Sequence, residues 1–325
     1  RKLNCDNLYH ILEVLTNHFN VDFNIDYWTS FVTDYINKYN FQKKLYHKLI
    51  RKINPKIIIE VVYYTFNNML INDIAKIEKI PTIELQHGVM GKYHIAYNFY
   101  KKKKYNWFPD YIFLYGHYWK NKSRLPIEDE HIKVVGWPYY EDKLEKNKIV
   151  HKLGIKSDKQ IILFLSQPTI GKDLSQLAVN LYNLLDKNQY ELKYKLHPRE
   201  FDNWREEYKS LLSTKIQVID TNYHDIHYYF SIAKIQIGVY STSIYEGLGY
   251  NLKTYIFKAF GYNFMEDLYL KTNIKLVETA IDIKKDLDTL SNKYDVIESN
   301  SFWEKNSLLK VKSEIEKIMR NHKLN

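Results

Sequence analysis

The 325-residue sequence has few of the residues that build several common kinds of site. Its one cysteine, Cys5, excludes a disulfide framework and any zinc or iron–sulfur site that needs several cysteines. No stretch approaches the roughly 18 apolar residues of a membrane-spanning helix. The 10 glycines form none of the GxGxxG, GxxxxGK[ST] or GxSxG patterns, which disfavours NAD chemistry, P-loop binding and a serine nucleophile elbow. The expected location is cytoplasmic and reducing.

Positive charge predominates, because 48 Lys and Arg stand against 38 Asp and Glu, giving a net charge of +10 and a pI of about 9.1. Nucleic acid or an anionic membrane would suit such a charge. No helix-turn-helix, RNP or zinc-finger pattern is present, so no nucleic-acid partner is expected. The densest basic run, Lys101–Lys104, is flanked by Tyr100 and Tyr105. It is interpreted either as a solvated loop or as a patch for peripheral contact with anionic lipid at the inner membrane face.

Short apolar runs alternate with stretches of helical spacing, which predicts a doubly wound α/β fold. Strands are expected at 57–64, 82–85, 110–115, 132–135, 161–165, 194–196, 216–219, 235–239 and 253–257. Helices are expected within 1–55 and at 67–80, 174–185, 226–233, 243–249 and 302–319. A polar linker at 139–148 separates an acceptor-side domain, 1–142, from a nucleotide-binding domain, 143–325.

Polar clusters follow several of these strands, and ligands of open α/β sheets bind at the carboxyl ends of strands. In the first cluster His87 follows a strand and precedes Gly88, which permits a tight turn. A neutral imidazole there can accept a proton from a substrate hydroxyl. Glu84 is a second candidate base. A turn histidine that binds backbone carbonyls explains the pattern equally well.

Two further clusters lie in the second half. Pro198 holds His197 extended, and Arg199 supplies a charged fork suited to phosphate. Hydroxyl groups at 241–243 stand between a strand and a helix, where they either cap the helix or present its N-terminus to an anion. Glu246, three residues after Ser243, fits a capping box or a ribose contact. The cluster residues are His197, Pro198, Arg199, Ser241, Thr242, Ser243 and Glu246.

A weaker fourth cluster spans 166–173 at another strand end. Thr169, Gly171 and Lys172 could place backbone amides and a cation beside a phosphate, or form a plain turn.

The His-Gly, His-Pro and Ser-Thr-Ser motifs resemble those of bacterial GT-B transferases of capsule and surface polysaccharide synthesis. The resemblance includes sialyltransferases, polysialyltransferases and Kdo transferases, and also the CDP-glycerol transferases of teichoic acid. It implies two Rossmann-like domains facing a cleft, with a C-terminal helix, and donor contacts from His197 and residues 241–243 to a cytidine phosphate. It carries the role of base onto His87. Two motifs depart from it: Val239-Tyr240 stands where teichoic-acid enzymes have an acidic residue, and no acidic-acidic-Gly motif of sialyltransferases is evident in residues 1–100.

The leading hypothesis is therefore a metal-independent glycosyltransferase that moves a sugar from a nucleotide-linked donor, most simply a CMP-sugar, to a growing surface or capsular polysaccharide. The acceptor would be a glycan or lipid-linked glycan, and no cofactor beyond the donor is expected. The alternatives are a CDP-alcohol (glycerol or ribitol) phosphotransferase, a sugar-nucleotide epimerase, and a non-catalytic scaffold of the same fold.

Overall fold

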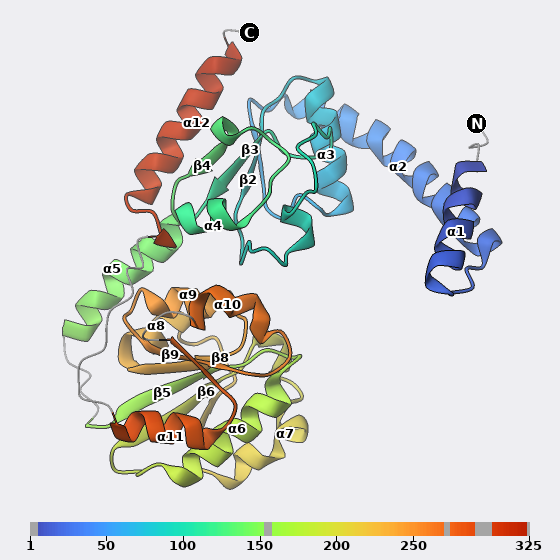
Figure 1. Cartoon of the computed structure of the whole chain (residues 1–325). Coiled ribbons are helices and arrows are strands. Elements are labelled where there is room, and N and C mark those ends of the chain that lie inside the picture. The colour runs from blue at the N-terminus through green and yellow to red at the C-terminus, as the bar shows by residue number, and fades with distance from the viewer. Residues whose placement is uncertain (1–5, 153–157, 270–273, 290–300, 324–325) are drawn as a thin grey trace. The chain divides into compact units, whose positions relative to one another are not determined.

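The structure is a computed structural model that describes residues 6–152, 158–269, 274–289 and 301–323; Cys5 lies outside these ranges (Figure 1). Its α-helices are α1 Asp6–Phe19, α2 Ile25–Ile53, α3 Phe66–Ile77, α4 His117–Lys122, α5 Pro138–Lys152, α6 Gly171–Leu184, α7 Trp204–Glu207, α8 Ile226–Ile232, α9 Thr242–Leu248, α10 Glu266–Tyr269, α11 Ala280–Thr289 and α12 Ser307–Lys323. Its strands are β1 Ile58–Glu60, β2 Thr82–Leu85, β3 Tyr111–Leu114, β4 Ile132–Val134, β5 Gln160–Leu165, β6 Tyr190–Lys195, β7 Gln217–Ile219, β8 Ile235–Gly238, β9 Lys253–Phe257 and β10 Ile274–Val277.

The strands form two sheets, as the alternating pattern predicts. The four-stranded sheet has the order β1-β2-β3-β4, and β1 pairs parallel with β2. The six-stranded sheet has the order β10-β9-β8-β5-β6-β7, and its neighbouring strands all pair in parallel. The predicted two-sheet α/β fold with a C-terminal helix, α12, is confirmed.

Two local expectations were wrong. The strand predicted at 57–64 ends at Glu60, because Val62 has a φ of +62° and turns the chain out of extended geometry. The polar stretch 139–148, expected as a linker, is part of α5. Proline is favourable at the first position of a helix, so Pro138 begins α5 instead of interrupting the chain.

The chain forms two compact units: residues 1–85, 103–112 and 317–325 make up the first, and residues 86–102 and 113–316 the second. The predicted domain boundary after residue 142 falls within α5 and stays a prediction.

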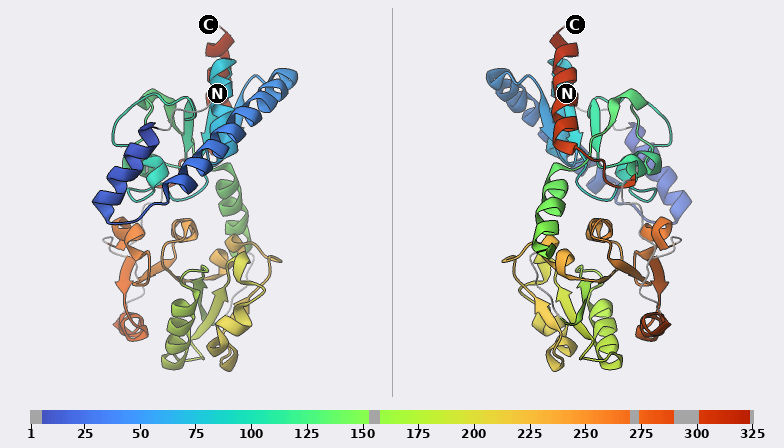
Figure 2. Two further views of the ribbon diagram at one scale, coloured as in Figure 1. Left: turned by 90° about the vertical axis from the view of Figure 1, so that its right-hand side faces the viewer. Right: turned by 90° about the vertical axis from the view of Figure 1, so that its left-hand side faces the viewer.

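In the first unit, α2 contacts both α1 and α3 (Figures 1 and 2). Asn24 starts α2 by accepting the Tyr27 N–H, and Asn54 ends it in the left-handed conformation. The buried side chain of Ile50 packs with Leu70 and Ile74 of α3. This contact covers only one side of α2 and leaves a long face exposed.

Candidate functional site

The six-stranded sheet reverses its strand order at β5, which lies between β8 and β6. Ligands of open α/β sheets bind beside such a point, outside the carboxyl ends of the strands. Ser166 follows β5, His197 follows β6 after one residue, and Ser241 follows β8 after two. These three side chains line one pocket of about 290 Å³, which we call the strand-end pocket.

The strand-end pocket contains four of the ten residues predicted for donor binding. His197, Pro198, Ser241 and Ser243 line it. Arg199 is exposed outside the lining. The lining also includes polar residues that the sequence analysis gave no role: Lys195, Asn222, His224 and Asp225. Asn222, His224 and Asp225 follow β7, so the same rule about strand ends would have found them.

A hydrogen bond to the His197 ring determines which ring nitrogen carries the hydrogen. Its Nδ1 accepts the Arg199 N–H at 3.2 Å, so a neutral imidazole must carry its hydrogen on Nε2. Partial burial lowers the pKa of His197, which favours the neutral ring. The ring therefore offers an Nε2–H donor, which suits a phosphate oxygen.

Glu200 fixes the position of the segment that contains His197. Its carboxylate is buried and accepts the His197 N–H at 2.6 Å, the Ser166 hydroxyl at 2.8 Å and the Tyr208 hydroxyl at 2.6 Å. These bonds join the segments that follow β5 and β6. A capping box therefore forms in this protein at His197 and Glu200.

Lys195 brings a buried cation to the pocket wall. Its Nζ donates to the carbonyl oxygens of Leu196 at 3.1 Å and Thr221 at 3.4 Å. Burial lowers its pKa, while the charges of Asp220 and Glu200 act in the opposite direction. Ser241 caps α9 by accepting the Ser243 N–H, which leaves the Ser241 hydroxyl hydrogen available to a ligand. The pocket thus presents hydrogen-bond donors and the Lys195 cation, together with the Asp225 carboxylate, which is paired with Lys143.

The capping box proposed for Ser243 and Glu246 does not form, because Ser241 caps the helix. Glu246 is buried outside the pocket lining, with Oε2 3.5 Å from Nε2 of His227. Burial raises the pKa of Glu246 to about 7 and lowers that of His227 to about 4. The predicted ribose contact of Glu246 is therefore not supported by its position.

The three residues predicted to contact phosphate in the fourth cluster lie in different surroundings. Gly171 is buried against Tyr208 and Glu200, so it serves packing and is not open to a phosphate. Lys172 is exposed outside the strand-end pocket. The Thr169 hydroxyl is hydrogen-bonded to the Tyr240 hydroxyl.

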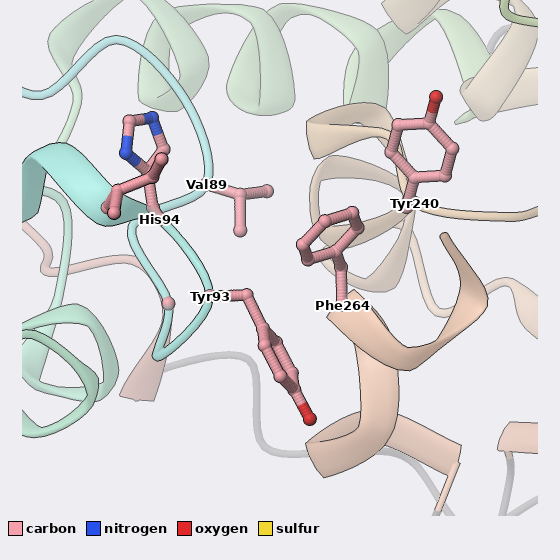
Figure 3. Close-up of a pocket in the computed structure, with 7 residues that line it drawn as sticks. Val89, Tyr93, His94, Tyr240 and Phe264 are labelled. Carbon is pink, nitrogen blue, oxygen red and sulfur yellow. The ribbon is translucent and has the colours of Figure 1, made fainter. Parts of the chain in front are cut away.

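A second pocket of about 300 Å³ is lined mainly by apolar and aromatic side chains, and we call it the aromatic pocket (Figure 3). Its lining is Val89, Gly91, Tyr93, His94, Ile95, Tyr240 and Phe264. Figure 3 shows Val89 and His94 on one side and Tyr240 and Phe264 on the other. Tyr240, which lines the aromatic pocket, directly precedes Ser241, which lines the strand-end pocket.

His87 lies on the loop that leads into the aromatic pocket. Gln86 shapes this loop by accepting the Tyr115 N–H and donating to the Gly88 carbonyl, both at 2.8 Å. A Cβ added at Gly88 would lie 3.5 Å from the Thr242 hydroxyl oxygen, so the loop approaches the first residue of α9. Burial lowers the pKa of His87, and the charge of His94 lowers it further by a smaller amount. His94, which the sequence analysis missed, also has a pKa lowered by burial.

Glu84, the second candidate base, is 0% exposed and accepts the Tyr63 N–H at 3.2 Å. A substrate hydroxyl cannot reach it in this structure. It pairs in register with Glu60 of β1, which is also buried. Glu60 Oε1 accepts from Asn72 at 2.7 Å, while Glu60 Oε2 and Asn72 Oδ1 have no hydrogen-bond partner among the described residues. Desolvation raises the pKa of Glu60 to about 8, and the charge of Glu84 adds to the rise.

This cluster makes stability depend on pH. The folded-state pKa of Glu60, about 8, lies above the unfolded value of about 4.3. The folded chain therefore binds the extra proton between these values, and the free energy of unfolding should fall as pH rises, by up to about 1.4 kcal/mol per unit. Urea titrations from pH 5 to pH 8.5 should show a shallower slope for Glu60→Gln. Glu145→Gln, at an exposed position, is the control, and an equal slope in all three proteins would contradict the assignment.

The basic run Lys101–Lys104 is exposed, and part of it is engaged. Lys102 lies 3.3 Å from Asp129 and 3.6 Å from Glu128. The described helices include none that is both long and apolar enough to cross a membrane. Within the same residues, no group of three or more His, Cys, Asp and Glu side chains is placed to hold a metal ion.

Comparison with known proteins bears on the fold. No protein-family model and no curated protein sequence matches the chain. The UDP-GlcNAc 2-epimerase of Methanocaldococcus jannaschii has a similar structure, with a TM-score of 0.59 and 15% identity over 86% of this chain and 81% of that one. S. aureus MnaA, solved with UDP, has a TM-score of 0.54 and 14% identity over 87% of this chain and 79% of that one. The wall teichoic acid polymerase TagF has a lower TM-score of 0.47, with 15% identity over 75% of this chain and 68% of that one. The chain thus has a GT-B-like fold of two Rossmann-like parts.

Proposed function

We propose that the chain is a glycosyltransferase that takes a sugar from a nucleotide-linked donor, most simply a CMP-sugar, and adds it to a glycan of a bacterial surface polysaccharide. The observation that carries the proposal is the strand-end pocket. It gathers Ser166 from the end of β5, Lys195 and His197 from the end of β6, and Ser241 from the segment after β8. This is the place where α/β sheets bind nucleotides.

The chemistry of this pocket suits a phosphate that gains charge as it leaves. When the bond between the anomeric carbon and the phosphate oxygen breaks, its electron pair stays on that oxygen. An Nε2–H of His197, the hydroxyl hydrogens of Ser241 and Ser243 and the cation of Lys195 can stabilise the resulting charge. Fixed donors of this kind cost little reorganisation during the reaction.

The remaining half of the reaction is assigned to His87. The acceptor hydroxyl forms the new bond to the anomeric carbon, and its proton passes to the neutral imidazole. The lowered pKa of His87 keeps the ring neutral near pH 7. The role rests on the approach of its loop to Thr242, the residue after Ser241.

The aromatic pocket favours a sugar over a smaller group. Tyr93, Tyr240 and Phe264 offer flat apolar faces, and Tyr240 directly precedes Ser241 of the strand-end pocket. Such faces suit the apolar side of a pyranose ring. A CDP-linked glycerol would use this surface poorly. We therefore place sugar transfer ahead of CDP-alcohol phosphotransfer.

Binding of a nucleotide should raise the thermal midpoint. At a concentration of one hundred times Kd, CMP should raise the free energy of unfolding by about 2.7 kcal/mol. This corresponds to a rise of several degrees in the thermal midpoint. His197→Ala and Lys195→Met should abolish most of the shift. Lys172→Met is the matched control, because Lys172 was predicted to bind phosphate but lies outside the pocket.

The pattern of responses also separates the alternatives. If UDP alone raises the thermal midpoint, the donor is a UDP-sugar and not a CMP-sugar. Mass spectrometry of reactions with CMP-sugars, CDP-glycerol and UDP-GlcNAc then identifies transfer, phosphotransfer or epimerisation. A failure of every nucleotide to shift the midpoint would overturn the proposed function and favour a scaffold.

A further inference from the structure

An apolar surface that the proposed function does not use lies on α2. Phe41, Leu45, Leu49 and Ile53 are 71%, 58%, 46% and 62% exposed. Each stands four residues after the one before it. At 100° per residue they form a single stripe within an arc of about 120°. Helices of soluble proteins normally bury such a stripe.

The side of α2 that contacts α3 is a different one. There Tyr39 and Tyr46 pack against the cluster of Ile50, Leu70 and Ile74. The Tyr39 hydroxyl donates to Asp73 at 2.5 Å, and Lys43 also pairs with Asp73. The exposed stripe is therefore not the inner face of the contact with α3.

Positive charge runs alongside the stripe. Lys44, Lys48 and Lys52 each precede a residue of the stripe by one position and so form a parallel row. All three are exposed, and none makes an ion pair within the described part of the chain. No Asp or Glu occurs between Tyr35 and Ile53. An apolar stripe bordered by unpaired lysines is the pattern of helices that lie in the plane of an anionic membrane.

We propose that the Phe41–Ile53 face of α2 docks on the surface of a membrane rich in anionic lipid, with the stripe in the acyl boundary and the lysines at the head groups. A second copy of the chain suits the face less well, because it would bring two rows of lysines together. The predicted patch at Lys101–Lys104 is also a weaker site, since Glu128 and Asp129 neutralise Lys102. This inference is independent of the proposed function.

Vesicle flotation tests the proposal with the whole chain. We expect binding to vesicles of phosphatidylcholine and phosphatidylglycerol in equal amounts, weakened by salt, and much weaker binding to phosphatidylcholine alone. Each lysine near the surface contributes about fivefold, so Lys44→Gln with Lys48→Gln should lower partitioning about 25-fold. Leu45→Ser with Leu49→Ser should lower it at least about tenfold. Lys101→Gln with Lys103→Gln is the charge-matched control and should change it little.

A fluorescent probe locates the contact. In a Cys5→Ser background, an environment-sensitive dye on Leu45→Cys should shift to the blue with anionic vesicles, whereas the same dye on Leu212→Cys, another exposed site, should not. The thermal midpoints of the variants should match the parent, because the substituted side chains are exposed. Absence of vesicle binding, equal binding to neutral vesicles, or loss of binding only in the Lys101/Lys103 variant would overturn the proposal. A dimer that Leu45→Ser dissociates, without vesicle binding, would assign the face to a second copy instead.

Discussion

Replacing His87 with glutamine should lower kcat of sugar transfer by about a hundredfold to ten-thousandfold, which is the usual contribution of a general base. Donor binding should survive, because the strand-end pocket does not include His87. A CMP-induced thermal shift equal to that of the parent would show this. His94→Gln should reduce the rate less, and His322→Gln, at an exposed position of α12, should leave it unchanged.

The pH profile gives a second measure of the same residue. Burial and the charge of His94 lower the pKa of His87 below its usual 6.5. The active form of a base is the neutral ring, so kcat/KM should rise with pH through a value below 6.5 and then stay level. If His94→Gln abolishes the reaction while His87→Gln retains it, His94 is the base and His87 is not.

Adding one methyl group at Gly171 should cost about 2–4 kcal/mol of stability. An Ala Cβ there would overlap the Tyr208 hydroxyl and lie 2.5 Å from Glu200 Oε1. Relief of this overlap must displace Tyr208 or Glu200, and Glu200 holds both Ser166 and His197. Gly171→Ala should therefore lower both the urea midpoint and the affinity for CMP.

Two companion variants test the cause. In Tyr208→Phe the hydroxyl is absent, so the double variant with Gly171→Ala should cost less than the sum of the two single changes. Gly91→Ala should change stability by no more than about 0.5 kcal/mol, because a Cβ there meets only Val89 at 4.0 Å. If the losses of stability in Gly171→Ala and Tyr208→Phe simply add in the double variant, the overlap with the Tyr208 hydroxyl is not what destabilises Gly171→Ala.

Most elements could be predicted because their signals are local. The strand β2 at 82–85 and the strand β9 at 253–257 occupy the predicted residues. The errors also have local causes: Val62 leaves extended geometry after β1, and Pro138 starts a helix at the expected linker. The strand β10 and the helix α11 were not predicted.

The candidate site was predictable only in part. Residues directly after strands could be found, and His197, Ser241 and Ser243 do line one pocket. The roles of Gly171 and Glu246 could not be found, because a sequence does not say which side of a turn or helix faces the interior. Lys195 was passed over since a lysine in a strand gives no sign of whether its ammonium group is buried.

By itself, the sequence determined the α/β class, the positions of most strands and the polar residues that end them, because hydrophobic periodicity and turn residues act over a few positions. The tertiary structure alone decided that β8, β5 and β6 are neighbours, and so which strand ends share a pocket. It alone left one stripe of α2 uncovered. Strand order and helix contacts depend on packing between segments far apart in the chain, which no local pattern encodes.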